Sequence, residues 1–231
     1  MDGRGRDSRL ETEIAHDGRE HPVRIPADGV TLEGALAVPA EAGGVVLFAH
    51  GSGSSRHSPR NNFVARVLRN AGVGTLLFDL LTEKEDRIYE TRFDIDLLTR
   101  RLIAATRWFT EQPQHRGLAV GYFGSSTGAA SALRAAAALG PAVGAVVSRG
   151  GRPDLAGRAL PHVQSPTLLI VGGDDLPVID LNQQAYDQMK AERGLKIIPG
   201  ATHLFEEPGT LEEVARLAAD WFQRHLRVKR D

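Results

Sequence analysis

The chain of 231 residues contains no cysteine. Disulfide bonds, thiolate metal ligands and a cysteine nucleophile are therefore excluded. An excess of charge of one sign is also lacking, because 28 basic residues are balanced by 29 acidic ones and the formal net charge is −1. So small a net charge provides no general attraction for nucleic acid or anionic lipid, and we expect neither nucleic acid nor a membrane as a partner.

Long apolar runs and repeats are missing too. The most apolar stretch, residues 135–147, is interrupted by Gly140, Pro141 and Gly144, which argues against a membrane span. The first residues are charged and lead into no apolar segment, so we expect no secretory signal and a cytoplasmic location. We expect a flexible N-terminus over residues 1–9 and a single domain over residues 10–231. No pattern predicts an oligomeric state.

Short apolar runs alternate with amphipathic helical patterns along the chain. Five of the runs have the composition of strands buried on both faces of a parallel sheet. They are residues 45–49, 75–78, 119–123, 143–147 and 167–171, and a further strand is expected at 195–198. Ahead of them, two alternating runs flank Asp28-Gly29, a pair typical of a hairpin turn. The sequence therefore predicts an α/β fold: a mostly parallel central sheet with an N-terminal antiparallel hairpin and helices on both faces.

Three local patterns predict where helices begin or are absent. Ser58-Pro59 has the pattern of an N-cap followed by proline in the first helical turn. Thr210 and Glu213 have the spacing of a capping box at the start of the last helix. The charged stretch 82–90 is expected to be a surface loop.

The stretch Gly124-Ser125-Ser126-Thr127-Gly128 lies between an apolar strand and an alanine-rich helix. A serine on so tight a turn is exposed, and the amide of Thr127 at the helix start points toward developing negative charge. Ser126 is therefore the candidate nucleophile. The alternative interpretation is an ordinary serine-rich loop, which the flanking strand and helix disfavour.

A serine nucleophile needs a base and a group that orients the base. His203 follows the last strand and is the candidate base. Asp175 is preferred over its neighbour Asp174 as the orienting acid, and Asp79, at another strand end, is the third candidate. Because Ser126, Asp175 and His203 all follow predicted strands, we expect them on one edge of the sheet.

The loop His50-Gly51-Ser52-Gly53 follows an earlier strand. We expect its histidine to brace the loop, and the amide of Ser52 to complete an oxyanion hole with that of Thr127. A phosphate cradle is the other interpretation, but no Gly-Lys-Ser or Gly-Lys-Thr follows.

With these motifs in the order Ser, Asp, His, the chain from about Val23 to Leu226 resembles the α/β-hydrolase superfamily and, within it, the dienelactone-hydrolase-like group. The resemblance implies the α/β-hydrolase fold and hydrolysis of esters or related acyl compounds. Dienelactone hydrolases proper use a cysteine nucleophile, which this chain lacks, so a serine carboxylesterase acting on a small-molecule ester is expected. No cofactor and no metal are expected, since no histidine pair has metal-ligand spacing.

Residues 148–166 are too few for a helical lid between two strands, so we expect no substantial lid and a preference for short acyl chains. Four side chains are possible substrate contacts, either free for an anionic group or already bound to nearby acids: Arg56, His57, Arg149 and Arg152. The alternative functions are an amidase, thioesterase or perhydrolase with the same triad, or a non-catalytic ligand-binding protein of this fold.

Overall fold

A computed structural model describes residues 16–226, so the N-terminus expected to be flexible (1–9) lies outside the described residues. Within them, eight strands form one sheet in the order β1-β2-β4-β3-β5-β6-β7-β8. The strands are β1 (His21–Ala27), β2 (Val30–Ala37), β3 (Gly44–Ala49), β4 (Gly74–Phe78), β5 (Ala119–Ser125), β6 (Val143–Arg149), β7 (Thr167–Gly172) and β8 (Arg193–Ile198).

Strands β1 and β2 form the predicted hairpin around Asp28-Gly29, with Ala27 opposite Val30. Both turn residues have positive φ, 45° and 77°, as a type I′ turn requires. Strand β2 also pairs antiparallel with β4, whereas the pairs from β4 through β8 are parallel. The mostly parallel sheet with an N-terminal antiparallel hairpin is therefore confirmed.

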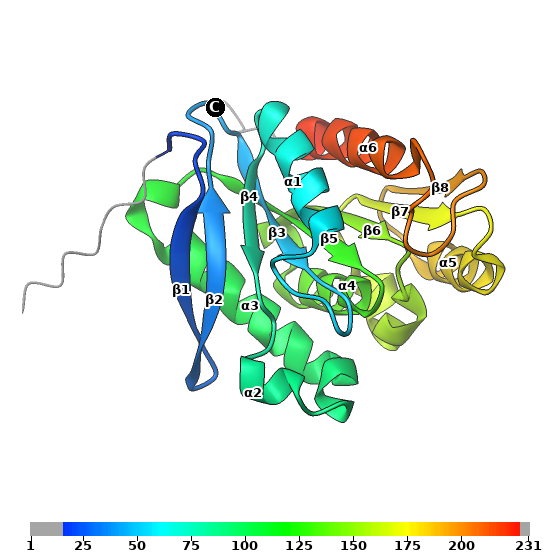
Figure 1. The fold of residues 1–231 in the computed structure, drawn as a ribbon, viewed down its shortest axis with the longest axis horizontal. Helices are drawn as coiled ribbons and strands as arrows, with labels where there is room; N and C mark the ends of the chain where they lie inside the picture. The colour runs from blue at the N-terminus through cyan, green and yellow to red at the C-terminus, as the bar shows by residue number, and fades with distance from the viewer. Residues whose placement is uncertain (1–15, 227–231) are drawn as a thin grey trace, which may run out of the picture.

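Helices cover both faces of the sheet (Figure 1). Helices α1 (Pro59–Asn70) and α6 (Thr210–His225) pack on one face, and α3 (Ile95–Glu111), α4 (Thr127–Leu139) and α5 (Leu176–Gln188) on the other. Helix α1 begins as predicted, because Ser58 Oγ accepts a hydrogen bond from Asn61 N and Pro59 occupies the first turn. Short 3-10 segments complete the connections: η1 (Glu90–Phe93), η2 (Pro113–His115), η3 (Gly140–Ala142) and η4 (Pro153–His162).

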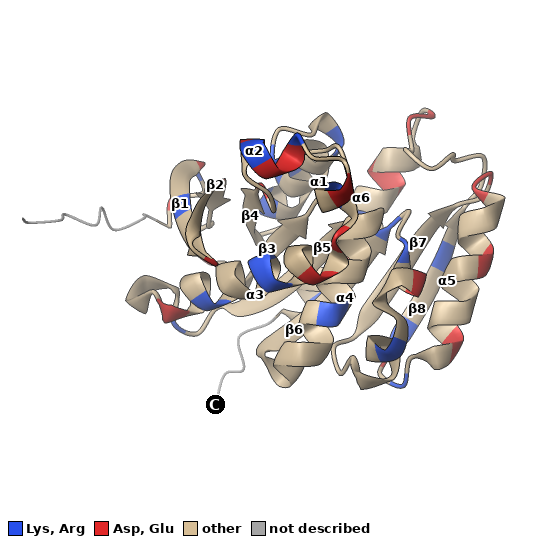
Figure 2. Cartoon of the chain, turned by 90° about the horizontal axis from the view of Figure 1, so that it is seen from below, with Lys and Arg blue, Asp and Glu red and all other residues tan. Residues whose placement is uncertain are grey.

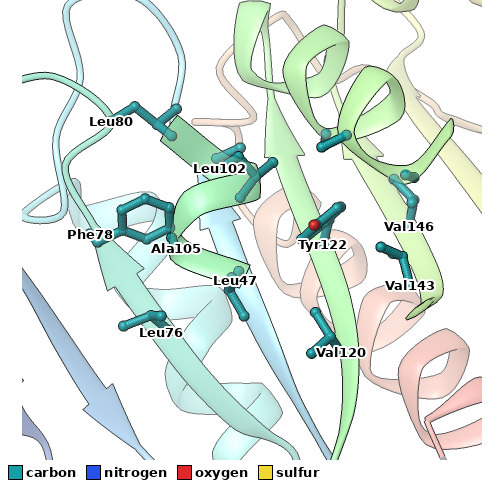
Figure 3. Close-up of a cluster of buried hydrophobic side chains, with 14 of the residues drawn as sticks. Leu47, Leu76, Phe78, Leu80, Leu102, Ala105, Val120, Tyr122, Val143 and Val146 are labelled. Atoms are coloured by element: carbon teal, nitrogen blue, oxygen red, sulfur yellow. The ribbon is translucent and has the colours of Figure 1, made fainter. Parts of the chain in front are cut away.

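The core against α3 is built from alternate side chains of the central strands (Figure 3). Leu47 of β3, Leu76 of β4 and Tyr122 of β5 are fully buried there. The Tyr122 hydroxyl lies 2.6 Å from Thr106 Oγ1 on α3, which satisfies the one polar atom that this tyrosine brings into the core. Burial raises the pKa of Tyr122 well above its ordinary value.

Two local predictions are wrong. The stretch expected to be a loop contains the short helix α2 (Glu83–Asp86), because Thr82 and Glu85 cap its start reciprocally. The capping box expected at Thr210 is absent: Gly209 is the N-cap in a left-handed conformation, and the Thr210 hydroxyl donates to the carbonyl of Glu207 instead.

Between β6 and β7 the structure has only η4, so no lid is evident among residues 16–226. No helix in that range is both long and apolar enough to cross a bilayer. Lys and Arg are interspersed with Asp and Glu over the elements in view (Figure 2), as the near-zero net charge suggests.

Candidate active site

The turn from β5 into α4 holds Ser126 in a conformation that serine rarely adopts. Its φ is 49° and its ψ −122°, and such a backbone costs about 1–3 kcal/mol in a residue other than glycine. The turn is also crowded, because a Cβ at Gly128 would lie 2.1 Å from the carbonyl oxygen of Ala49, and one at Gly124 would lie 2.5 Å from Cα of Ala129. Gly128 thus lets the start of α4 approach β3 closely, and Gly124 lets it pack against the end of β5, so the half-buried Ser126 lies at a tight turn between them.

Three loops at the carboxyl ends of β5, β7 and β8 bring Ser126, Asp175 and His203 together. His203 Nε2 lies 3.3 Å from Ser126 Oγ, and His203 Nδ1 lies 2.7 Å from Asp175 Oδ2. The aspartate side chain is 13% exposed and the imidazole 38% exposed. The acid is thus largely shielded from water while the histidine remains accessible from the serine side.

The structure distinguishes the two neighbouring aspartates. Asp175, the predicted acid, contacts the imidazole, whereas Asp174 is exposed and its amide donates to the carbonyl of Ala201. Asp79 is engaged elsewhere, since its carboxylate accepts hydrogen bonds from the backbone amide and the guanidinium of Arg56. Of the three candidates, only Asp175 can orient the histidine.

The two residues expected to form the oxyanion hole contact each other. The amide of Ser52 donates a 2.9 Å hydrogen bond to Thr127 Oγ1, while the amide of Thr127 lies at the start of α4, where no carbonyl of the helix is available to it. Of the two amides expected to form the oxyanion hole, that of Ser52 is therefore already bonded within the protein. A buried threonine hydroxyl needs a partner, and the amide of Ser52 is the one nearest to it.

His50 has the bracing role expected of it. Its Nδ1 donates to the carbonyl of Gly51, and its Nε2 accepts from the amide of Leu80, both at 3.0 Å. Burial lowers the pKa of this histidine, so it remains neutral while it fixes the loop that carries Ser52 to the end of β4.

A cavity of about 600 Å³ lies behind that loop, on the side of β2 and α2. Arg56 and His57 line it together with four acids, and the Arg56 guanidinium also lies 3.6 Å from Glu33. Neither Ser126 nor His203 lines this cavity. Arg56 is therefore bound to Asp79 and Glu33, which is the second of the two possibilities that the sequence left open, an arginine already bound to nearby acids.

Arg149 and Arg152 are likewise not free to contact an anionic group. Arg152 forms two hydrogen bonds of 2.8 and 2.7 Å to the carboxylate of Asp154, the alternative that the sequence left open. Arg149 is 7% exposed and contacts Leu204 and Phe205 rather than open solvent. Asp154, two residues along the chain, gives the Arg152 guanidinium a partner. Arg149 lies at the end of β6, where its guanidinium meets the carbonyl of Leu204 in the loop after β8.

Two buried asparagines near the site were not singled out from the sequence. Asn61 Oδ1 accepts a 3.1 Å hydrogen bond from the hydroxyl of Ser125, which ties the turn before Ser126 to α1. Asn182 Nδ2 donates to the carbonyl of Gly151 at 3.0 Å. A polar residue at an otherwise apolar helix position is the only signal that could have marked them. No group of three histidine, aspartate or glutamate side chains among the described residues could hold a metal ion.

Comparison with known proteins finds relatives of this chain. A dienelactone hydrolase from Anabaena variabilis is 56% identical, with a TM-score of 0.90 over 92% of this chain and 100% of that one. A curated Mycobacterium tuberculosis protein with the provisional name phosphoribosyl transferase is 58% identical over 208 residues. The match covers 90% of this chain and 47% of that protein, so the chain spans about half the length of the curated relatives that it matches.

A more distant structure shows the fold alone. Est1E from Butyrivibrio proteoclasticus is 17% identical and has a TM-score of 0.74 over 88% of this chain and 98% of that one. The model of the dienelactone hydrolase family, in contrast, matches residues 33–228. This chain, an α/β hydrolase by its sheet order and structural neighbours, belongs to the dienelactone hydrolase family.

Proposed function

We propose that the chain is a serine hydrolase that cleaves short-chain carboxylic esters through an acyl-enzyme on Ser126. The observation that carries the proposal is the hydrogen-bonded series from Ser126 Oγ through His203 to Asp175, at 3.3 and 2.7 Å. A serine hydroxyl is a weak nucleophile until a base stands within reach, and an imidazole oriented by a carboxylate is such a base. Family membership supports hydrolysis, and the absence of cysteine leaves serine as the nucleophile.

In the first half of the reaction, His203 Nε2 takes the proton of Ser126 Oγ as the oxygen attacks the ester carbonyl. The imidazolium that forms keeps its Nδ1 proton in the hydrogen bond to Asp175, whose negative charge stabilises it. His203 then gives the Nε2 proton to the leaving alcohol. Hydrolysis of the acyl-enzyme repeats the sequence, with water donating its proton to Nε2 and the acid leaving from Ser126.

The negative charge on the carbonyl oxygen needs donors. The amide of Thr127 is one of them. The amide of Ser52 donates to the Thr127 hydroxyl in this structure. When that hydroxyl rotates about χ1 and moves away, the Ser52 amide is free to donate to the oxyanion and becomes the second donor. Each such donor is typically worth about 3 kcal/mol of the barrier.

A preference for short acyl chains follows from the small amount of protein above Ser126. The connection between β6 and β7 is one 3-10 segment of ten residues, η4, so little apolar surface is available to cover a long chain. Burial of apolar area contributes only about 25 cal/mol per Å², and an acyl chain that stays in water gains none of it.

Covalent labelling with a fluorophosphonate tests the proposal. We expect the wild type to be labelled and to hydrolyse p-nitrophenyl acetate, and Ser126→Ala to do neither while remaining folded. Ser131→Ala is the matched control, because it removes a buried hydroxyl from the same helix, α4, away from the turn. Labelling that survives in Ser126→Ala would refute the assignment. A wild type without labelling or turnover would favour the non-catalytic ligand-binding alternative.

The same assay distinguishes the alternative reactions. A matched p-nitroanilide and a matched thioester test for an amidase and a thioesterase, and the oxygen ester with added hydrogen peroxide, assayed for the peracid, tests for a perhydrolase. We expect kcat/KM to be highest for hydrolysis of the oxygen ester. An anilide or thioester that is turned over faster would reassign the substrate class but leave the triad in place.

We further propose that the activity named in the Mycobacterium tuberculosis relatives belongs to the part of those proteins that this chain does not cover. The model of the dienelactone hydrolase family matches residues 33–228 of this chain. The part of the Mycobacterium tuberculosis relative that aligns with this chain is 47% of that protein, so more than half of it lies outside the match. The chain alone is expected to release no pyrophosphate from phosphoribosyl pyrophosphate under conditions where it hydrolyses p-nitrophenyl acetate. Release of pyrophosphate would refute this division.

A further inference from the structure

Arg149 is the last residue of β6. The next residue, Gly150, lies against His203, because a Cβ there would be 3.0 Å from the carbonyl oxygen of His203. With Ala145 and Val147, Arg149 occupies the face of the sheet that α1 and α6 cover, and it is 7% exposed. It is also bound through its backbone to the catalytic turn, since its carbonyl accepts a 3.3 Å hydrogen bond from the amide of Ser126. The backbone of Arg149 is therefore hydrogen-bonded directly to the proposed nucleophile, independently of its side chain.

The burial of this guanidinium has an unusual cost. It forms no ion pair with any carboxylate among residues 16–226, its Nε has no hydrogen-bond partner, and the nearby cation of Arg60 repels it. Burial, followed by that repulsion, lowers the pKa of Arg149 to about 10. A buried charge without a counter-ion destabilises a fold, and an apolar side chain of similar size is often better tolerated in such a place.

The contacts that the guanidinium does make lie in the loop that carries His203. Its Nη1 donates to the carbonyl of Leu204 at 3.5 Å, and its Cζ lies 5.8 Å from the centre of the Phe205 ring. Phe205 is 1% exposed and has a φ of 56°, so this loop holds a strained, buried residue two positions after His203. Both contacts act within two residues of His203.

We infer that Arg149 is a positioning residue, which joins the Ser126 turn through its carbonyl to the His203 loop through its guanidinium and so sets the distance between Ser126 Oγ and His203 Nε2. The inference rests on the proposed serine-hydrolase function. It explains why a guanidinium is placed where a methionine would cost the fold less stability. Since the Arg149 side chain is buried against Leu204 and Phe205, its loss acts on catalysis through the geometry of the pair.

Arg149→Met and Arg149→Lys test the inference, with Arg193→Met as the matched control. Arg193 also packs over an aromatic ring, that of Tyr186 at 4.6 Å, and also has an unpartnered Nε, but it lies at the start of β8, the opposite end of the strands. On p-nitrophenyl acetate we expect Arg149→Met to lower kcat by about 10- to 100-fold, as a small misplacement of reacting groups does, with KM within about twofold. Arg149→Lys, which keeps a cation and a donor, should recover part of that kcat, and Arg193→Met should match the wild type.

Two further measurements separate positioning from a structural role. The melting temperature of Arg149→Met should equal or exceed that of the wild type, because an unpaired buried charge has been removed. The downfield Nδ1 proton resonance of His203, visible by NMR without substrate, should shift or broaden in Arg149→Met and stay in place in Arg193→Met.

The inference is overturned by an Arg149→Met variant that folds and keeps kcat within twofold of the wild type, or whose kcat loss Arg193→Met reproduces. It is also overturned if Arg149→Lys is no more active than Arg149→Met. Should Arg149→Met fail to fold, Arg149→Gln, which also removes the cation, takes its place: a kcat within twofold of the wild type together with an unchanged His203 resonance refutes positioning. Each of these outcomes leaves the labelling of wild-type Ser126, and with it the proposed function, intact.

Discussion

The replacement of Asp175 by asparagine perturbs the proposed mechanism at one atom. Asp175 Oδ2 accepts the Nδ1 proton of His203 at 2.7 Å, which leaves Nε2 free to accept the proton of Ser126. An asparagine can present its NH₂ group to Nδ1 instead. The ring proton then moves to Nε2, and the histidine donates to Ser126 rather than accepting from it.

Two effects set the size of the loss. A carboxylate and an imidazolium whose charge centres are about 4 Å apart attract each other by roughly 4 kcal/mol at an effective dielectric constant of about 20, which suits a carboxylate that is mostly but not fully buried. At about 1.4 kcal/mol for each factor of ten, the lost attraction accounts for roughly a thousandfold. The unfavourable tautomer adds to this loss, and the precedent for this exchange in a serine protease is about ten-thousandfold.

The assay compares kcat/KM for p-nitrophenyl acetate in Asp175→Asn and Asp174→Asn. The second variant is the matched control, because Asp174 is the exposed neighbour and contacts the loop only through its amide. We expect about ten-thousandfold loss in the first variant and less than about threefold in the second. Equal losses, or a larger loss in Asp174→Asn, would refute the assignment of the acid.

Three further predictions concern stability and specificity. Gly128→Ala should lower the free energy of unfolding by roughly 1–3 kcal/mol or more, measured by urea unfolding, because its Cβ would overlap the carbonyl oxygen of Ala49; a wild-type midpoint would contradict this. Burial lowers the pKa of His50 and His115, so each stays neutral in the folded protein while the unfolded chain takes up protons below about pH 6.5. Stability should therefore decline as pH falls below about 6.5, by up to about 1.4 kcal/mol per pH unit for each histidine, and a His115→Gln variant should show a shallower decline. Acetyl and butyryl p-nitrophenyl esters should have a higher kcat/KM than the palmitoyl ester, and the reverse order would show that the site covers long chains.

The places of the strands along the chain and of the candidate triad residues at strand ends could be predicted from the sequence, because both depend on short-range patterns. Asp28-Gly29 specifies a turn by its own conformational preferences, and Ser126, Asp175 and His203 each follow a run that is plainly a strand. The preference for Asp175 over Asp174 depended on the number of residues in a tight turn, and Asp175 is the one of the two that contacts His203.

What could not be predicted depends on contacts between distant residues. Thr127 and Ser52 are 75 positions apart, and their hydrogen bond depends on how closely α4 approaches β3. The burial of Arg149 likewise follows from the path of the loop after β8, which no local pattern records. The error at Thr210 has a local cause instead, since Glu213 is bound to Arg216 and Gly209, in a left-handed conformation, takes the N-cap position.

The left-handed backbone at Ser126 has a consequence for how this sequence is maintained. Glycine would occupy that conformation without strain, so a chain selected for folding alone would gain by exchanging the serine for glycine. Such a change would give a more stable protein that lacks the proposed nucleophile. Under the proposed function, selection for the reaction keeps serine at this turn, and a lineage in which the reaction lost its value would drift toward glycine there.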